Sequence, residues 1–378
     1  MTMSAASTNG RDFALDAFRG LAILGMTLVN LQGSGPVAFG AFEHAAWNGV
    51  TLADLVFPFF LLAAGLAVPL ALDRRAREGA FAAVLRRTVL LFLIGVAINW
   101  LYRPSADPHA LRVAGVLQRI AIVYLACAWL CLLTKGWRIP LIVAGLLLTI
   151  HGALLFLPAP GEAVASFAQG QGMSAWLDRL ALPGRPFRPD YDPEGLLSTL
   201  SAIASGMIGV TVQRMVQHRG RTSGSSLRLI GAAAAIGLIL AGVAALWWPF
   251  NKALWTPSFA LLTTGLGLAL WGLLRAVWSR LQASASASAS ASAWALRAAL
   301  FVALLGQTAL TLYVVQALLA GLLIQNVGED SLWDLSFGTL SRIGLSPAWT
   351  SLLFAVIAGA VSIAITLWLR RRDWLLRL

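Results

Sequence analysis

Residues 51–72 read Thr-Leu-Ala-Asp-Leu-Val-Phe-Pro-Phe-Phe-Leu-Leu-Ala-Ala-Gly-Leu-Ala-Val-Pro-Leu-Ala-Leu, an apolar run whose single charged residue is Asp54. About 20 apolar residues are enough for a helix to cross the hydrocarbon core of a membrane. The stretch therefore predicts a transmembrane helix with an acid near its start. Because a charge in such a segment is costly, an ionisable residue there is a candidate functional residue.

The whole chain repeats this pattern of apolar runs separated by short basic loops. Its 378 residues are 58% hydrophobic and 12% charged, whereas soluble proteins carry about 25% charged residues. The runs are longer than the strands of a membrane barrel, which have about ten residues. Since a backbone in lipid must satisfy its own hydrogen bonds, the sequence predicts an all-α, polytopic helical membrane protein. The net charge of +12 does not indicate nucleic-acid binding, because the arginines lie between the apolar runs.

We predict ten membrane-spanning helices from these runs. They lie near residues 15–32, 51–72, 86–101, 113–133, 139–157, 194–213, 229–247, 256–278, 298–324 and 347–369. Lysine and arginine are more frequent at both termini and in every second loop. By the positive-inside rule, this bias places the N- and C-termini in the cytoplasm and the loop between the first two spans on the outer side.

The chain is predicted to form one membrane-embedded domain over residues 1–378. Residues 283–292 are five Ala-Ser repeats, which we interpret as a low-complexity cytoplasmic linker. The longest outer loop, 158–193, ends in a polar segment in which Asp192 precedes Pro193. This order predicts a helix whose N-cap is Asp192 and whose first helical residue is proline.

His44 stands ten residues before Asp54, at the mouth of the second span, and Asn30 ends the first. Histidine takes and gives protons near neutral pH, with an ordinary pKa of about 6.5. A carboxylate such as Asp54 can orient the ring and stabilise its cation. Asn30 can donate a hydrogen bond to a developing oxyanion. With Asn48 nearby, these residues are the parts of an acyl-transfer site.

Structural interpretations of the same residues remain open. Thr51 and Asp54 fit a capping box at the start of the second span, a role compatible with catalysis. Trp47 fits the aromatic belt of a membrane interface. Asn30 can cap its own helix, and a histidine in a loop can simply be solvated.

Other polar residues lie at or near the predicted spans. Gln118 and Arg119 lie inside the fourth, where a buried arginine needs an anion from the protein or from a ligand. Asn251 and Lys252 lie on the outer side, before the eighth span.

These residues stand in motifs that resemble the heparan-α-glucosaminide N-acetyltransferase family of transmembrane acyltransferases. The resemblance covers nearly the whole chain, is strongest over 11–72 and 113–125, and is weak after about residue 300. The motifs, in order, are Asp16-Ala-Phe-Arg-Gly20, Leu28-Val-Asn30, His44-Ala-Ala-Trp-Asn-Gly49, Thr51-Leu-Ala-Asp-Leu-Val-Phe-Pro58, Gly115-Val-Leu-Gln-Arg119, Tyr191-Asp-Pro-Glu-Gly195 and Asn251-Lys-Ala-Leu-Trp255.

The resemblance implies transfer of an acetyl group from cytosolic acetyl-coenzyme A to the amine of a glucosamine-type sugar on the far side of the membrane. It implies that His44 is catalytic with Asn30 beside it, and we add Asp54 as its partner. Candidates for binding substrate or coenzyme are Trp47, Asn48, Gln118, Arg119, Asp192, Glu194, Asn251, Lys252 and Trp255. The resemblance further implies a homodimer and, for a bacterial member, the inner (cytoplasmic) membrane. No metal is expected.

This chain also departs from the family pattern. Lysosomal relatives have an additional luminal domain, and a histidine in a late span where this chain reads Leu312-Tyr-Val-Val-Gln316. Because the donor is cytosolic and His44 is predicted to be near the outer face, we expect the 33–50 loop to dip into the bundle. The thioester would rise through a polar channel, with its nucleotide phosphates near Arg86 and Arg87.

Three other functions fit the same sequence. An amino-sugar transporter would also have many spans and buried polar groups. An O-acyltransferase acting on a cell-envelope polysaccharide would share the catalytic parts. A non-catalytic scaffold would bind no coenzyme.

Overall fold

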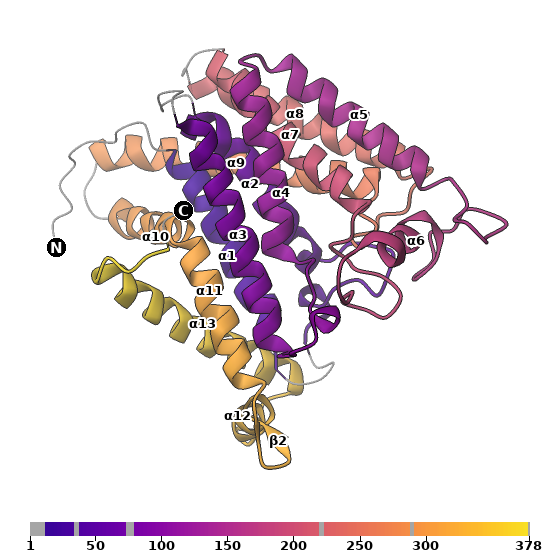
Figure 1. Ribbon diagram of the computed structural model, residues 1–378. Coiled ribbons are helices and arrows are strands. Elements are labelled where there is room, and N and C mark those ends of the chain that lie inside the picture. Colours follow the sequence, from indigo (N-terminus) through magenta and orange to yellow (C-terminus); the bar gives the residue numbers. More distant parts are fainter. Residues whose placement is uncertain (1–11, 34–37, 73–78, 219–222, 288–290, 377–378) are drawn as a thin grey trace.

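The computed structural model describes residues 12–33, 38–72, 79–218, 223–287 and 291–376 (Figure 1). Within these ranges the chain is almost entirely helical. The α-helices are α1 (Phe13–Asn30), α2 (Leu52–Leu72), α3 (Ala80–Tyr102), α4 (Val116–Leu133), α5 (Arg138–Leu154), α6 (Gly172–Ala181), α7 (Ser198–His218), α8 (Ser223–Ala244), α9 (Pro257–Ala287), α10 (Ala291–Gln307), α11 (Ala309–Leu323), α12 (Leu332–Ser341) and α13 (Pro347–Arg371). Two short 3-10 helices, η1 (Gly40–Phe42) and η2 (Pro108–Ala110), and one hairpin of β1 (Asn326–Val327) and β2 (Asp330–Ser331) complete the described elements.

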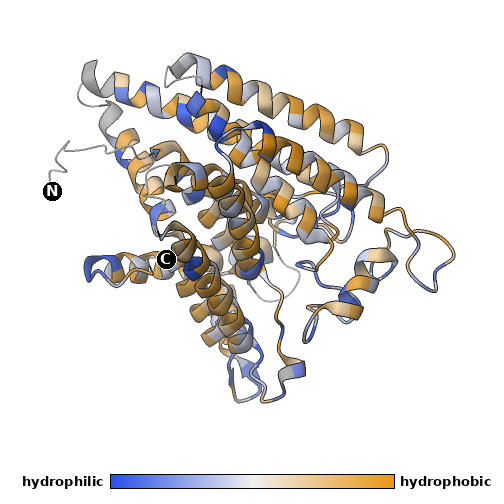
Figure 2. Cartoon of the chain, turned by 45° about the horizontal axis from the view of Figure 1, so that its top comes forward, coloured by the Kyte–Doolittle hydropathy of each residue, from blue (hydrophilic) through white to orange (hydrophobic). Residues whose placement is uncertain are grey.

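The helices confirm the prediction of an all-α, multi-pass membrane protein. Figure 2 shows apolar residues along the helices and hydrophilic residues gathered at helix ends and in loops. In the described ranges, seven helices are long and apolar enough to cross a membrane: α1, α2, α3, α4, α8, α9 and α13. The bent pair α10 and α11 makes an eighth span if it is counted as one.

Each of the ten predicted spans coincides with a helix or a helix pair. Eight of them meet this criterion of length and composition when α10 and α11 are counted as one span. Helix α5 has 17 residues, at the lower limit for a bilayer crossing. Helix α7 is rich in Ser, Thr and Gly, and most of its residues are buried among other helices. The hydroxyls of Ser205 and Thr211 donate to carbonyls of the same helix.

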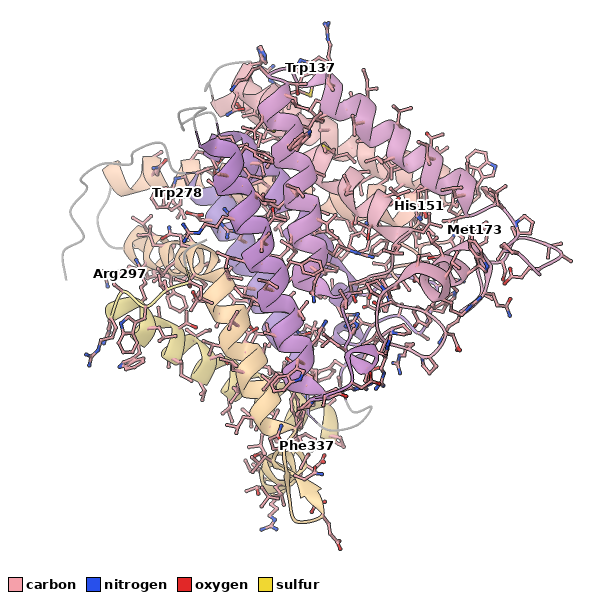
Figure 3. All side chains as sticks on the ribbon, in the orientation of Figure 1. Trp137, His151, Met173, Trp278, Arg297 and Phe337 are labelled. Carbon is pink, nitrogen blue, oxygen red and sulfur yellow. The ribbon has the colours of Figure 1, made fainter. Side chains whose placement is uncertain are left out.

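The bundle has two distinct ends. Figure 3 marks one end by Trp137, at the turn between α4 and α5, and the other by Phe337 on α12. The ring of Phe39, in the loop after α1, meets Trp349 at the start of α13. Helices α1 and α13 therefore run in opposite directions, and the start of α1 and the end of α13 lie toward the same end.

Helix α2 lies at the centre of the bundle and contacts α1, α4, α7 and α9. Its contact with α7 is a backbone contact, because Gly65 lies against Gly206. A Cβ atom added to Gly65 would stand 1.9 Å from the carbonyl oxygen of Gly206. Small residues of this kind allow membrane helices to approach closely.

We predict that Gly65→Ala destabilises the protein, because the added methyl group has no space between two helix backbones. Overpacking of this kind costs about 1–3 kcal/mol. The control is Gly231→Ala in α8, where an added Cβ meets no atom within 4 Å. Thermal unfolding in detergent, followed by tryptophan fluorescence, should show a lower midpoint for the first variant alone. Equal midpoints would contradict the predicted backbone contact.

The ninth predicted span, 298–324, is broken in the structure. Helices α10 and α11 meet at an angle of 72° around Thr308. A Cβ atom at Gly306, near the end of α10, would lie 1.8 Å from the carbonyl oxygen of Asp16. The Gln307 side chain donates a hydrogen bond to the Asp16 carboxylate at 3.0 Å. These contacts hold the end of α10 against the start of α1.

Helix α9 continues into the Ala-Ser repeat as far as Ala287, and α10 begins at Ala291. Alanine is the strongest helix former, which explains why this part of the predicted linker is helical. Residues 288–290 lie outside the described residues. We assign no chemical role to the repeat.

Candidate functional site

His44 and Asp54 form a close pair where the loop after α1 meets the start of α2. The His44 Nδ1 atom lies 2.8 Å from Asp54 Oδ1. The Asp54 side chain is 1% exposed, whereas that of His44 is 50% exposed. The second carboxylate oxygen of Asp54 accepts hydrogen bonds at 3.1 Å from the backbone amides of Ala45 and Thr51 and from the Thr51 hydroxyl. Asp54 is thereby held rigidly beneath the imidazole ring.

The bond from the Thr51 amide to Asp54 is one half of the predicted capping box. Asp54 therefore satisfies the start of α2 and contacts His44 at the same time. The capping role is confirmed by this contact, and the catalytic role of Asp54 stays a prediction.

Lys252, from the loop between α8 and α9, completes a three-residue cluster. Its Nζ atom lies 3.1 Å from Nδ1 and 3.3 Å from Nε2 of His44, and 3.4 Å from Asp54 Oδ1. Burial lowers the pKa of the Lys252 ammonium, and the negative charges of Asp54 and Glu194 partly offset this effect. The cluster thus places one cation and one anion on a half-exposed histidine.

The hydrogen-bonding capacities of these groups identify the tautomer of His44. An ionised carboxylate only accepts hydrogen bonds, so the hydrogen between His44 and Asp54 belongs to Nδ1. In the neutral ring, Nε2 is then the basic atom. Its position 3.3 Å from the Lys252 ammonium places a hydrogen-bond donor beside the atom that would handle protons.

Asn251 joins the Lys252 loop to the His44 loop. Its side-chain amide donates to the Trp47 carbonyl at 3.1 Å and to Asn48 Oδ1 at 3.0 Å. Its own Oδ1 accepts from the Leu254 amide at 2.8 Å. Asn251 is fully buried, so it acts as a structural bridge that fixes Lys252 over His44.

Trp47 braces the same loop from the other side. Its indole donates a 2.7 Å hydrogen bond to the Phe167 carbonyl, and its ring meets Tyr191 edge to face at 5.1 Å. The hydrogen bond ties the loop to the long 158–193 segment. Trp47 is therefore a support of the site in this structure.

A cavity of about 500 Å³ opens beside His44. That volume is typical of small-molecule sites. The cavity is lined mostly by apolar side chains from α1, α2, α3, α4 and α11. Its polar and charged lining residues are Asn30, His44, Asn99, Tyr102, Arg112, Glu194, Lys252, Tyr313 and Gln316.

The cavity extends from the site end into the bundle. On α11 its lining runs from Ile324 to Tyr313, which is about 16 Å at 1.5 Å per residue. On α1 the deepest lining residue is Met26, and on α2 it is Phe57. Lining residues among the described positions thus cover about half of a bilayer about 30 Å thick.

Arg112 is the main feature of the site that sequence reasoning missed. Its guanidinium binds both oxygens of Asp192, at 2.9 and 2.7 Å, and a Glu194 oxygen at 2.5 Å. Burial opposes the charge on Arg112, but the hydrogen bond to Asp192 and the charges of Glu194 and Asp192 raise its pKa well above the ordinary value. The Arg112 guanidinium also lies over the ring of Phe187, with its central carbon 4.7 Å from the ring centroid.

Asp192 is not the helix N-cap that the sequence predicts. It accepts from the backbone amides of Glu194 and Phe187 at 2.9 and 2.8 Å, but residues 192–197 form turns and α7 begins at Ser198. Burial would raise the pKa of Asp192, yet its bond to Arg112 and the arginine charge lower it overall. The ion pair therefore determines the local conformation and delays the start of the helix.

Arg119 is buried, as predicted, but no carboxylate or ligand anion holds it. Its guanidinium donates to the carbonyls of Pro193 and Gly195, at 3.1 and 2.9 Å, and to the Ser198 hydroxyl at 2.5 Å. It also lies 5.3 Å from the ring centroid of Trp255. Carbonyl dipoles replace the expected anion, and Arg119 ties the 193–198 turn to the bundle.

The predicted site residues thus separate into two groups. Asn30, His44, Glu194 and Lys252 line the cavity, and Asp54 lies directly beneath His44. The remaining predicted residues lie outside the cavity lining: Trp47, Asn48, Gln118, Arg119, Asp192, Asn251 and Trp255. Gln118 packs against Gly95 between α3 and α4, and Trp255 is fully buried.

Gln316, in the late span where lysosomal relatives have a histidine, also lines the cavity. Its side-chain amide donates to the Thr27 hydroxyl, which itself donates to the Ile23 carbonyl at 2.8 Å. The Gln316 oxygen is buried and has no hydrogen-bond partner. No local pattern in the sequence marks this residue as part of the site.

Asp178, on α6, packs under the same turn as Arg119, and its carboxylate accepts from the Leu196 amide at 2.8 Å. Burial raises the pKa of Asp178 to about 6. The folded protein therefore binds this proton more tightly than the unfolded chain. The contribution of protonated Asp178 to folding stability is fully present below about pH 4 and is lost as the pH rises through about 6.

We predict that Asp178→Asn is more stable than the unmodified protein at pH 7.5 and that this gain is smaller at pH 4.5. Asparagine keeps an acceptor for the Leu196 amide but carries no buried charge. The gain at neutral pH should be at most about 3 kcal/mol. Thermal unfolding midpoints across this pH range measure it. The control is Asp190→Asn, whose carboxylate is exposed. A pH dependence identical to that of the unmodified protein would contradict the prediction.

Comparison with known proteins bears on this site. Residues 11–191 match the family model described as heparan-alpha-glucosaminide N-acetyltransferase, catalytic. This match covers just under half of the chain. The matched region holds His44, Asp54 and Arg112, whereas Glu194, Lys252 and Gln316 lie beyond it.

Two relatives of the family extend the similarity along the chain. Heparan-alpha-glucosaminide N-acetyltransferase of Homo sapiens is 28% identical in an alignment of 308 residues. The alignment covers 65% of this chain and 45% of the human protein. The Mus musculus protein of the same name is 28% identical over 312 residues, 67% of this chain and 47% of the mouse protein. The chain spans about half the length of the curated relatives that it matches.

Proposed function

We propose that this protein is a membrane-embedded acetyltransferase that moves an acetyl group from acetyl-coenzyme A to the amine of a glucosamine-type sugar. The observation that carries the proposal is His44, held by buried Asp54 at the mouth of a cavity between membrane-spanning helices. The match of residues 11–191 to the family model supports it, as do the names of the two relatives.

The cavity lining suits such a donor and acceptor. Its inner wall is mostly apolar, with the carboxamides of Asn99 and Gln316 and the hydroxyl of Tyr313 as isolated polar groups, which fits a flexible arm containing amides. Its charged lining groups are Arg112, Glu194 and Lys252, and Lys252 contacts His44. Glu194 and Asp192 share the single positive charge of Arg112. A sugar amine in its ammonium form is attracted by the Glu194 carboxylate.

The first route uses His44 as a general base. Its Nε2 atom takes a proton from the sugar ammonium, and the free amine attacks the thioester carbonyl. A C–N bond forms, the C–S bond breaks, and the thiolate leaves as a thiol with the proton that His44 returns. The nitrogen of the new amide releases its remaining extra proton to water. Asp54 stabilises the imidazolium between these steps. Asn30 and the Lys252 ammonium offer hydrogen bonds to the carbonyl oxygen as negative charge develops on it.

The second route uses His44 as the nucleophile. Its Nε2 atom attacks the thioester carbonyl, the thiolate leaves, and the acetyl group resides on the ring until the sugar amine removes it. In both routes Asp54 holds the same tautomer. They differ in whether acetyl transfer to the protein precedes binding of the sugar.

The acetyl donor is proposed to enter from the cytoplasm and the sugar from the periplasmic side. The supporting observation is the distribution of basic residues in the sequence, which places the His44 loop on the outer side. Assembly as a homodimer in a bacterial inner membrane is part of the same proposal. Light scattering of the purified protein in detergent would measure the number of subunits.

The test is a transfer assay with purified protein in proteoliposomes. Acetyl-labelled coenzyme A is supplied on one side, and glucosamine or a sugar bearing only hydroxyl groups on the other. The proposal expects label on the amine of glucosamine. Label on the hydroxyl sugar alone would indicate an O-acyltransferase, and counterflow of sugar without any coenzyme would indicate a transporter. Either result would reject the proposed activity.

A further inference from the structure

Arg87, on α3, is a charged residue inside a membrane-spanning helix for which the fold supplies no anion. It lies seven residues after the start of α3, and its guanidinium carbon is 4.7 Å from the ring centroid of Tyr124 on α4. Its Nε atom is buried and has no hydrogen-bond partner. In the part of the chain that the structure describes, no carboxylate pairs with Arg87.

Two other arginines of the bundle donate to acceptors within the fold. The terminal nitrogens of Arg119 bind two carbonyls and a hydroxyl, although its Nε atom is buried without a partner, like that of Arg87. Arg214 donates to the carbonyls of Gly136 and Cys131. Because an arginine within a span is costly, an unpaired one indicates a functional partner from outside the chain. The guanidinium group favours phosphate, with which it forms charge-assisted hydrogen bonds.

One face of α4 holds both the ring beneath Arg87 and a lining residue of the His44 cavity. Tyr124, Ile120 and Val116 are spaced four residues apart and so lie on one face of the helix. Val116 lines the cavity. Helices α3 and α4 run side by side (Figure 1), and α3 also contributes Asn99 to the lining. Arg87 and Asn99 are twelve residues apart, which is about 18 Å along the helix axis.

We propose that Arg87 binds a phosphate group of the acetyl donor, toward the end of the bundle opposite His44. This inference rests on the proposed function. A donor whose reactive carbonyl lies at His44 and whose phosphate lies at Arg87 must be extended, with a narrow arm between the two groups. A coenzyme A thioester has this chemistry. The phosphate of a membrane lipid is the other source of the same group, and it has no thioester to place at His44.

Arg86 provides a matched control. It is adjacent in sequence and carries the same charge, but successive helical residues point about 100° apart and its side chain is exposed. Charge bias alone would make the two arginines equivalent in binding a phosphate. Because Arg87 also packs on Tyr124, comparing a ligand that has phosphates with one that lacks them separates a phosphate site from a packing role.

The experiment measures equilibrium binding to the full-length protein in nanodiscs of neutral phosphatidylcholine. The probes are coenzyme A and pantetheine, which has the same arm without phosphates. The variants are Arg87→Met, Arg87→Lys and Arg86→Met. We expect Arg87→Met to weaken coenzyme A binding about tenfold or more, and Arg87→Lys to weaken it less. Pantetheine binding should be unchanged in all variants, and Arg86→Met should behave like the unmodified protein.

Equal losses in the Arg86 and Arg87 variants would overturn the assignment, as would equal losses for coenzyme A and pantetheine. Unchanged coenzyme A binding in Arg87→Met would also overturn it. If that variant then loses bound anionic lipid in native mass spectrometry, Arg87 binds a lipid phosphate instead. Failure of the unmodified protein to bind coenzyme A at all would instead reject the proposed function. The two failures are therefore distinguishable.

Discussion

Replacing His44 by alanine is expected to reduce acetyl transfer by about 10²–10⁴-fold, the usual contribution of a positioned acid-base group. Both proposed routes need the Nε2 atom of His44, and no other described histidine lines the cavity. Asp54 would remain buried beside Lys252, so the site would keep its charges but lose its proton carrier. The rate of acetyl transfer from labelled acetyl-coenzyme A to glucosamine measures the effect.

The same variant should remain folded, because the His44 side chain is half exposed and contributes little to packing. His109→Ala, in the exposed 3-10 segment η2, is the matched control and should transfer acetyl at the normal rate. Mass spectrometry of the unmodified protein, incubated with acetyl-coenzyme A but no sugar, separates the two routes. An acetyl group on His44 would support the nucleophilic one. Normal turnover in His44→Ala would reject both.

Arg112→Met is expected to be the most destabilising substitution at the site. The side chain of Asp192 is 0% exposed and that of Glu194 is 10% exposed, and Arg112 is paired with both. Removing one partner of a buried ion pair costs about 3–5 kcal/mol, because the other charge stays buried without compensation. Thermal unfolding in detergent should show a large drop in midpoint.

The pH dependence of this variant makes the prediction specific. In the unmodified protein the pKa of Asp192 is lowered overall, so its stabilisation is present above about pH 4 and is lost as the acid is protonated. Without Arg112, only the backbone hydrogen bonds from Glu194 and Phe187 oppose the effect of burial, and protonation of Asp192 removes the cost of the buried charge. The lowering of the unfolding midpoint by Arg112→Met should therefore be smaller at low pH. Arg185→Met, an exposed arginine in the adjoining loop, is the control. A deficit that is constant with pH would contradict the ion-pair explanation.

Local patterns in the sequence were sufficient to predict the His44 and Asp54 pair. The two residues are ten positions apart, and the capping box at Thr51 fixes Asp54 at the start of α2. Apolar runs likewise predicted the helical bundle, because each run is long enough to be read independently. Lys252 is 208 positions from His44. It was nevertheless a candidate, because Asn251 and Lys252 stand in a motif that resembles the family. That motif did not show that Lys252 contacts the ring.

Contacts between distant segments were not predictable in this way. Arg112 is 80 residues from Asp192, and no spacing rule links them. Sequence reasoning therefore interpreted Asp192 as a helix cap and Arg119 as the residue that needs an anion. In the structure Arg112 holds the acid, and Arg119 binds carbonyls instead. Both errors arise because charge balance inside a bundle depends on which helices are neighbours.

The positions of the spans were predicted better than the contacts inside them. Hydropathy identified α7, but it did not show that Arg214 donates to the carbonyls of Gly136 and Cys131. It also did not show the bend at Thr308 or the close approach of Gly306 to the start of α1. Neither feature is encoded in the apolar run itself.

The backbone contact between Gly65 and Gly206 has a consequence for how the protein can move. Two helices that touch through their main chains cannot slide past each other without a steric clash, so α2 and α7 behave as one rigid body. Asp54, at the start of α2, and the turn that leads into α7 then keep a fixed separation. The opposite wall of the cavity is α11, which begins at the 72° bend after α10, so we expect any widening of the cavity to move α11 rather than α2.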